Sequence, residues 1–496
     1  MKLIINGPIK PYYIQMLVML FYPGEKFPEG ADAEGEERIC NVSVKLCEDG
    51  VESKVVLRDG ERSAEGEAFL QYGKLDEQRT IKFSAGGAFL NAATNLTGHT
   101  PPWGMLTGVR PARLALDLFD EGVRGEDAIK FFTDIYKTSE RKARLAVSCA
   151  TVSEKTVRSE VADECSVYVG IPFCPSRCAY CSFVSAASPK LLAMIPDYLE
   201  ALVRDIDRTF ALIRELGIRV ATVYIGGGTP TVLNEEQLKV LLHCIRENIS
   251  DLDEFTLEAG RPDTITEGKL SAAKAHGVTR VSVNTQTLND EVLLGIGRKH
   301  TAEDFYASYE LAVKSGIKDI NVDLIAGLPG DNFDSFAFSV DKIIDLGPTN
   351  ITVHTFSVKK SAEFKTEGAD VFDRDGLWAS KCVDYSQDAL SAAGYLPYYM
   401  YRQKNTVGNL ENVGYSKPGH EGLYNIYMMD ELHSIFACGA SSVTKIVTKF
   451  PDGKPRIERI FEPKYPYEYL KAREDGSWLK TKEENEAFIR QIYDLK

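Results

Sequence analysis

Three cysteines lie within eight residues of one another in the segment YVGIPFCPSRCAYCSF. Cys174, Cys178 and Cys181 form the spacing C-x3-C-x2-C, directly after a β-branched run that predicts a buried strand. Thiolates are the usual ligands of iron–sulfur clusters, and a cube of four irons normally takes four of them. Three cysteines therefore predict a [4Fe–4S] cluster with one iron open to another ligand.

The open iron suits S-adenosylmethionine (SAM), because it can bind the amino and carboxylate groups and pass one electron to the sulfonium, which releases methionine and a 5′-deoxyadenosyl radical. A structural zinc site is the alternative. A structural zinc ion normally has four protein ligands, so a histidine or a further cysteine would be needed close by, and the segment SFVSAASPK that follows Cys181 contains neither. The remaining cysteines are scattered and are expected to be small buried side chains: Cys40, Cys47, Cys149, Cys165, Cys244, Cys382 and Cys438.

The elements that must position this chemistry are short apolar runs that alternate with amphipathic stretches. Such alternation is typical of parallel strands joined by helices, and in barrels of this kind the chemistry lies in the loops after the strands. Six βα units predict an α/β barrel or partial barrel. The expected strands are 165–171, 220–227, 255–260, 280–285, 319–327 and 350–356, and the clearest helices are 195–216, 235–249 and 303–316.

A glycine run, Gly226 to Gly228, ends the second of these strands and is followed by Thr229 and Pro230. Glycines let the backbone approach a ligand closely, so one βα unit after the cysteines this loop suits the amino group of SAM. Glu258 ends the third strand, where a carboxylate suits an ammonium group or ribose hydroxyls.

The chain resembles a known family at these motifs. The motif C-x3-C-x-Y-C after YVGIPF resembles the cluster motif of the radical SAM superfamily. Four later motifs resemble those of the oxygen-independent coproporphyrinogen III oxidases, above all the HemZ-type coproporphyrinogen dehydrogenases. These motifs are YIGGGTPTVL, FTLEAGRPDTIT, VSVNTQTLNDEVLLGIGRKHT and NVDLIAGLPGD. The resemblance is strong over about residues 160 to 360 and covers the rest by general layout. It implies the radical SAM partial (β/α)6 TIM-like barrel.

The resemblance also implies site residues. Tyr168 and Glu258 would contact the SAM on the cluster, and the family binds a second SAM. The family's contacts with this second SAM correspond to Gly227, Gly228, Thr229, Gln286, Arg298 and Asp323. Arg298 can pair with a SAM carboxylate through two parallel hydrogen bonds, and a surface salt bridge is the alternative for it.

Two positions depart from the oxidase pattern. Phe183 stands where the oxidases have a further cysteine, as in the related heme-chaperone branch, and Gly170 stands where the family usually has a histidine. These changes leave cluster binding intact and put the transfer of the oxidase mechanism in doubt.

The 496 residues predict more than one domain. We expect an accessory α+β domain at 1–160, the barrel at 161–365 and a mixed substrate-covering domain at 366–496. The first domain contains three segments that are expected to be strands, CNVSVKLCEDG, ESKVVLRDG and TIKFSAGG. It also contains two segments that are expected to be helical, ARLALDLFDEG and EDAIKFFTDIYKTSERKARLAVS. Trp103 and Arg110 look exposed and are candidates for a docking surface, although a turn that leads into a helix is the favoured interpretation.

A formal charge of −14 argues against nucleic-acid binding. The apolar run from Ile14 to Tyr22 is too short to span a bilayer and lacks a signal cleavage site, so we expect a cytoplasmic protein without an integral membrane segment.

The leading hypothesis is a radical SAM oxidoreductase of heme biosynthesis that decarboxylates coproporphyrinogen III to protoporphyrinogen IX and takes electrons from a donor such as flavodoxin or ferredoxin. The alternatives are a heme-trafficking chaperone and a radical SAM methyltransferase that degrades heme. Arg177, Arg402 and Lys404 are weak candidates for binding the propionates, and His354, His420 and His433 are possible axial ligands of heme.

Overall fold

The computed structural model divides the chain into two compact units, residues 1–148 with 402–410 and residues 149–401 with 411–496. The domain boundaries expected near residues 160 and 365 stay predictions. The structure describes residues 1–28, 35–73, 75–108, 110–157, 163–181, 183, 185–249, 251–357, 377–403, 406–449 and 455–494.

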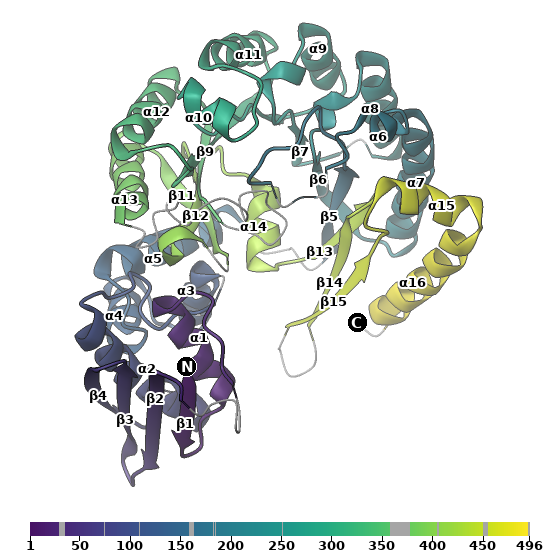
Figure 1. The fold of residues 1–496 in the computed structure, drawn as a ribbon. Coiled ribbons are helices and arrows are strands. Elements are labelled where there is room, and N and C mark those ends of the chain that lie inside the picture. Colours follow the sequence, from purple (N-terminus) through teal and green to yellow (C-terminus); the bar gives the residue numbers. More distant parts are fainter. Residues whose placement is uncertain are drawn as a thin grey trace. The chain divides into compact units, whose positions relative to one another are not determined.

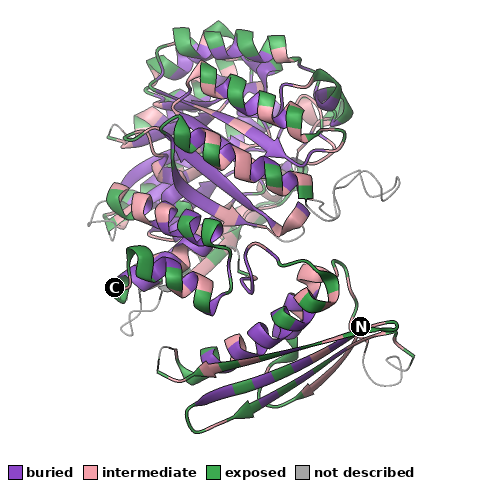
Figure 2. Cartoon of the chain, turned by 90° about the vertical axis from the view of Figure 1, so that its left-hand side faces the viewer, coloured by how far each residue is buried: buried purple, intermediate pink, exposed green. Residues whose placement is uncertain are grey.

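The first unit is an α+β structure with a four-stranded sheet in the order β1-β2-β3-β4. β1 runs parallel to β2, and the other neighbours are antiparallel. Helix α2 packs on β3 and β4, and buried and exposed residues alternate along the strands (Figure 2). The bounds are β1 (Lys2–Asn6), α1 (Pro11–Phe21), β2 (Arg38–Leu46), β3 (Gly50–Asp59), β4 (Arg62–Gln71), α2 (Glu77–Thr97), α3 (Pro111–Asp120), α4 (Gly125–Ile135) and α5 (Glu140–Thr156), the last of which crosses into the second unit.

The segment TIKFSAGG, expected to be a strand, lies inside α2, so that prediction was wrong. The side chain of Asp76 caps this helix by accepting a hydrogen bond from Arg79 N. Thr80, Ile81 and Ser84 are buried, which is the spacing of one helix face and not the alternation of a strand. The β-branched pair at 80 and 81 misled the prediction, because packing and capping outweighed local strand preference.

Trp103, expected to be exposed, is buried at 1% exposure, and the Arg402 guanidinium lies 5.4 Å above its ring. Arg402 also donates to the carbonyl oxygens of Leu106, Gly108 and Asn409. The segment is thus a packed turn before α3, and the expected docking surface was wrong for Trp103. Arg402 was a candidate for binding a propionate, but its Nη donors are used for hydrogen bonds that stabilise the first unit.

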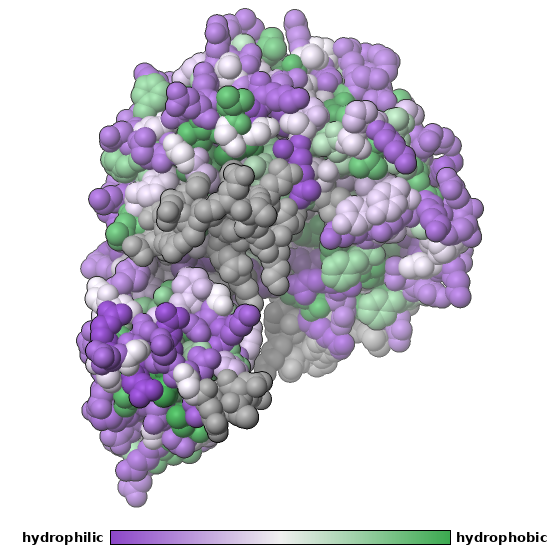
Figure 3. Space-filling model, viewed as in Figure 1, coloured by the Kyte–Doolittle hydropathy of each residue, from purple (hydrophilic) through white to green (hydrophobic). Residues whose placement is uncertain are grey.

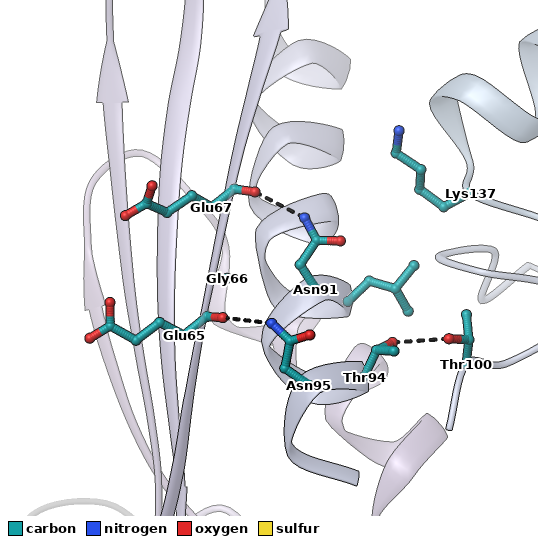
Figure 4. A pocket seen from close by; sticks show the side chains of 9 residues that line it. Glu65, Gly66, Glu67, Asn91, Thr94, Asn95, Thr100 and Lys137 are labelled. Carbon is teal, nitrogen blue, oxygen red and sulfur yellow. Dashed lines mark hydrogen bonds between the residues drawn. The ribbon is translucent and has the colours of Figure 1, made fainter. Parts of the chain in front are cut away.

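A hollow of about 530 Å³ lies beside the free edge of β4 in the first unit (Figure 4). Two side chains of α2 reach this edge strand: Asn91 Nδ2 donates to Glu67 O at 2.9 Å, and Asn95 Nδ2 donates to Glu65 O at 3.1 Å. Because an exposed strand edge can pair with another chain, these two bonds protect the sheet.

The second unit is built on an eleven-stranded sheet in the order β11-β12-β10-β9-β8-β7-β6-β5-β13-β14-β15 (Figure 1). β5 to β10 are parallel and confirm the six predicted strands. β12 pairs antiparallel with β10, β13 pairs parallel with β5, and β14 and β15 form an antiparallel pair beyond β13. Its two ends, β11 and β15, stay apart, as in a partial barrel.

The bounds of these strands are β5 (Glu164–Ile171), β6 (Arg219–Gly227), β7 (Glu254–Glu258), β8 (Arg280–Ser282), β9 (Asp319–Ala326), β10 (Asn350–Thr355), β11 (Leu396–Arg402), β12 (Glu411–Ser416), β13 (Ser434–Cys438), β14 (Val443–Lys449) and β15 (Pro455–Phe461).

Helices surround this sheet in an arc (Figure 1), and their outer faces are mostly hydrophilic (Figure 3). The structure confirms the three helices expected at 195–216, 235–249 and 303–316, two of which begin at capping boxes. No helix among the described residues is both long and apolar enough to cross a membrane. The bounds are α6 (Pro189–Leu192), α7 (Ile195–Glu215), α8 (Glu235–Asn248), α9 (Glu267–Ala275), α10 (Asp290–Gly295), α11 (Ala302–Lys314), α12 (Phe333–Leu346), α13 (Leu377–Ala392), α14 (Leu423–Asp430), α15 (Pro466–Glu474) and α16 (Ser477–Asp494).

Candidate functional site

The three clustered cysteines lie in the loop that follows β5, which we call the cysteine loop (residues 172–181). Backbone hydrogen bonds fix both halves of this loop. Cys174 N donates to Ala186 O at 3.2 Å, and Ala186 N donates to Pro172 O at 2.8 Å. Ala179 N donates to Ile296 O at 3.0 Å, so the segment after α10 holds the second half.

The thiols of this loop lie close enough to influence one another. Burial, with smaller contributions from the neighbouring Cys181 and Cys178, raises the pKa of Cys174 to about 11. Burial also raises the pKa of Cys181. Because iron binds the thiolate, these groups need a compensating positive charge nearby, and the irons of a cluster supply it.

Among the described residues, no group of three or more His, Cys, Asp or Glu side chains lies close enough together to hold one metal ion. In a [4Fe–4S] cube each thiolate binds a different iron, so a cluster does not require the three sulfurs to meet at a single point.

The glycine loop after β6 is bonded directly to the cysteine loop. Gly228 N donates to Ile171 O and Thr229 N donates to Phe173 O, both at 2.8 Å. The Thr229 hydroxyl donates to Cys174 Sγ at 3.4 Å. A Cβ atom on Gly228 would lie 2.5 Å from Phe173 O and 2.9 Å from Cys174 Sγ, so only glycine fits here. Gly228 therefore allows the glycine loop to lie directly against the Cys174 sulfur.

Arg261 is a residue of this site that the sequence analysis missed. It is buried, donates to the carbonyl and hydroxyl oxygens of Ser176 at 3.1 and 2.8 Å, and forms a two-pronged ion pair with Asp263 at 2.9 and 2.8 Å. Arg261 therefore ties the cysteine loop to the segment after β7. The motif EAGRPDTIT contains it, but an arginine in a loop carries no signal of burial.

The strands of the barrel carry half-buried polar side chains among otherwise buried residues. Tyr168 and Tyr224 stack with their ring centres 6.2 Å apart, and Tyr424 of α14 stacks on Tyr224 at 4.6 Å. Burial and the nearby Asp323 carboxylate raise the pKa of Glu258 to about 7. The structure thus places Tyr168, Glu258 and Asp323 near one another, together with Tyr224 and Tyr424, and their contacts with SAM stay predictions.

Gln286 and Asp323 are joined through the backbone. Gln286 N donates to Asp323 O, and Ile325 N donates to Gln286 O, both at 2.9 Å. Gln286 is buried with a φ of 76°, a left-handed conformation that is rare outside glycine and typical of functional sites. Asp323 N donates to Asn284 Oδ1 at 3.2 Å, which ties the ends of β8 and β9 together.

Arg298 is buried, so the alternative of a surface salt bridge is wrong. Its Nη1 donates to Asn284 O at 2.8 Å and to Gly260 O at 3.3 Å, and its Nη2 donates to the Tyr180 hydroxyl at 3.1 Å. Within the part of the chain that the structure describes, its Nε is buried without a hydrogen-bond partner. The structure places Arg298 between the cysteine loop and the ends of β7 and β8. A free buried donor there fits an anionic ligand group such as the SAM carboxylate.

The weaker candidates lie in different places. Arg177 is exposed on the cysteine loop, and Lys404 lies outside the described residues. His433 is buried, with Nε2 2.8 Å from the Ser166 hydroxyl, and His420 Nδ1 lies 2.5 Å from Asp319 Oδ1. These two histidines serve contacts within the fold.

The two departures from the oxidase pattern have different surroundings. The Phe183 side chain is 67% exposed. Gly170 lies beside β13, and a Cβ there would lie 3.3 Å from Ala440 O and 3.4 Å from Cys438 O. A side chain at position 170 would therefore press on the backbone that follows β13.

Comparisons with known proteins agree with this site. The family model of the radical SAM superfamily matches residues 168–343. The oxygen-independent coproporphyrinogen-III oxidase-like protein HemZ of Bacillus subtilis (strain 168) is 35% identical over 84% of this chain and 82% of its own. The heme chaperone HemW of Escherichia coli (strain K12) is 29% identical over 62% of this chain and 76% of its own.

A solved structure, the radical SAM enzyme coproporphyrinogen III oxidase (HemN) of Escherichia coli, is 25% identical, covers 60% of this chain and 68% of that one, and has a TM-score of 0.48. The match to the family model and the extent of the match to HemZ decide the assignment. The chain belongs to the radical SAM superfamily, whose members use a [4Fe–4S] cluster and SAM, and within it to the HemZ-type, oxygen-independent coproporphyrinogen III oxidase-like proteins.

Proposed function

We propose that this protein oxidatively decarboxylates two propionate side chains of coproporphyrinogen III to the vinyl groups of protoporphyrinogen IX, a step of heme biosynthesis. The observation that carries the proposal is the gathering of three thiols and a polar interior with Glu258 and Asp323 at the carboxyl ends of one parallel sheet. The similarity to the oxidase-like HemZ over most of both chains supports the same activity.

Cys174, Cys178 and Cys181 would hold the cluster in this reaction. When bound, the cluster supplies the electron that cleaves SAM into methionine and a 5′-deoxyadenosyl radical, which can take a hydrogen atom from the propionate β-carbon. Thr229 would influence the reduction potential of the cluster by donating a hydrogen bond to the Cys174 sulfur, and Arg261 holds the cysteine loop in place. A propionate that has lost this hydrogen releases CO2 and one electron to an acceptor, and the vinyl group remains.

Glu258 and the tyrosines shape the space for the nucleoside. The raised pKa of Glu258 lets its carboxyl accept or donate a hydrogen bond near neutral pH, which suits ribose hydroxyls. Tyr168 and Tyr224 line the interior beside it. We infer that SAM occupies this interior and that the tetrapyrrole approaches from the open carboxyl end of the sheet, with flavodoxin or ferredoxin as the electron donor.

A heme-trafficking role is the second candidate. The similarity to the heme chaperone HemW and the presence of Phe183 in place of the oxidase cysteine favour it. The structure offers little support for the proposed axial ligands, because His420 and His433 are engaged within the fold.

The test is anaerobic incubation of the reconstituted, reduced protein with SAM and coproporphyrinogen III, followed by chromatography and mass spectrometry. We expect 5′-deoxyadenosine that depends on the tetrapyrrole, and a tetrapyrrole that has lost two carboxyl groups. Cys178→Ser should abolish both products, whereas Cys47→Ser, a change at a cysteine outside the site, should preserve them.

Intact coproporphyrinogen together with tight binding of added heme would refute the decarboxylase and support the chaperone. Consumption of heme with transfer of a methyl group would instead assign the protein to heme degradation.

A further inference from the structure

Two aspartates of strand β9, one toward each end of the strand, are each paired with a histidine from another segment. Toward the carboxyl end, His354 Nε2 lies 3.6 Å from Asp323 Oδ2. At the amino end, His420 Nδ1 lies 2.5 Å from Asp319 Oδ1. The same pair of residue types thus occurs at the end of the barrel that carries the cysteine loop and at the opposite end. The pair with His420 at the opposite end therefore serves as a matched control for the pair with His354.

Both carboxylate oxygens of Asp323 have partners. Asn321 Nδ2 donates to Oδ1 at 2.8 Å, and the imidazole of His354 faces Oδ2. The other ring nitrogen of His354, Nδ1, lies 3.3 Å from the Tyr401 hydroxyl. The ring is therefore held from β11 and the carboxylate from β9, which fixes the direction in which Asp323 points.

A second acid shares this interior. The Asp323 carboxylate raises the pKa of Glu258 and His354 lowers it, so all three groups interact. Arg298 does not serve as the counter-charge here, because its Nη atoms donate to backbone carbonyls and to Tyr180. His354 lies against Asp323 and is near enough to Glu258 to act on its pKa, so its imidazole links the two acids.

We propose that His354 is a positioning residue for the second SAM. Held by the Tyr401 hydroxyl, its imidazole keeps the Asp323 carboxylate oriented toward the hydroxyl and ammonium donors of that ligand. The inference rests on the proposed function, because the second SAM is expected from the family. It adds a residue that belongs to none of the motifs and that acts through Asp323.

The test measures equilibrium binding of radiolabelled SAM to the reconstituted full chain and to three variants. The wild type is expected to bind two SAM molecules. His354→Ala removes the imidazole that lies between Asp323 and Tyr401, and should weaken one of the two sites about tenfold, the effect of one hydrogen bond. His354→Gln restores a hydrogen-bond donor and should recover most of this loss. His420→Ala should retain both sites.

Equal binding by His354→Ala and the wild type would overturn the proposal, as would a single SAM site in every variant. The same loss in His420→Ala, or no recovery in His354→Gln, would overturn it too, because the histidine would then act only through the fold. The proposed decarboxylation is judged separately, from tetrapyrrole products of the wild type, so a chaperone with two SAM sites would refute the activity and leave this inference standing.

Discussion

Replacing Gly228 with alanine tests whether the glycine loop gives the cluster its space. The added Cβ would lie 2.5 Å from Phe173 O and 2.9 Å from Cys174 Sγ, and the first distance is roughly 1 Å shorter than an ordinary contact. The nearest atom belongs to the backbone and cannot rotate away, so the cysteine loop must shift. Overpacking of this kind costs about 1 to 3 kcal/mol, or about 5- to 150-fold in the population of the native loop.

The assay is the iron and sulfide content of protein reconstituted under anaerobic conditions. We expect Gly228→Ala to hold clearly less iron than the wild type at the same protein concentration, with little change in secondary structure. Gly295→Ala is the control, because a Cβ at Gly295 would meet nothing within 4 Å. Full cluster content in Gly228→Ala would refute the argument that the loop is shaped around the Cys174 sulfur.

Three further predictions concern neighbouring side chains. The pKa of Glu258 in the folded protein is raised to about 7 from its usual 4.5, so the free energy of unfolding falls as the pH rises through this window. Glu258→Gln should therefore stabilise the apoprotein by at most about 3 kcal/mol at about pH 8 and by little at about pH 4, as measured by urea unfolding. Equal stabilisation at both pH values would contradict the argument that a buried acid is ionised at a cost. Arg261→Lys loses a two-pronged ion pair and should destabilise the apoprotein by about 2 to 4 kcal/mol, against less than about 0.5 kcal/mol for the exposed control Arg204→Lys; equal unfolding midpoints would contradict the anchoring role. Thr229→Val removes a donor to the Cys174 sulfur and should make the cluster's reduction potential more negative in a potentiometric titration, and an unchanged potential would show that the bond is lost when the cluster is bound.

The sequence predicted the barrel well because most positions of its strands are buried and are filled by β-branched and other apolar residues. Helices α7, α8 and α11 were predicted equally well, because their apolar residues recur at helical spacing. The strands β11 to β15 were not predicted. β12 is buried along its whole length, but its sequence ENVGYS mixes polar residues and a glycine with a single β-branched residue, so it does not read as an apolar run.

The site was predictable wherever chemistry requires one residue type. Only cysteine serves as a thiolate ligand, so Cys174 was predicted from its spacing. Gly228 was predicted from the glycine run and the family resemblance, and the structure adds that only glycine fits beside the Cys174 sulfur. The roles of Arg261 and His354 depend on which segments the fold brings together. Arg261 lies 85 residues from Ser176 along the chain, and the sequence gives no sign of that contact.

Gly170 shows how a position can depart from a family pattern for a reason of packing. The Tyr198 hydroxyl donates to Gly170 O at 2.8 Å and accepts a hydrogen bond from Ala440 N at 2.9 Å. It therefore clamps the end of β5 to the turn that follows β13. Asp205, fully buried on α7, accepts from Gly439 N at 3.1 Å and fixes the same turn from the other side.

A histidine at position 170 would have to move this turn, because even its Cβ would be tight against the carbonyls of Cys438 and Ala440. The strand that ends at position 171 leads directly into the cysteine loop, so the clamp made by Tyr198 also fixes where that loop begins. Glycine at position 170 therefore lets β5 lie close to the turn after β13 without a shift of either backbone.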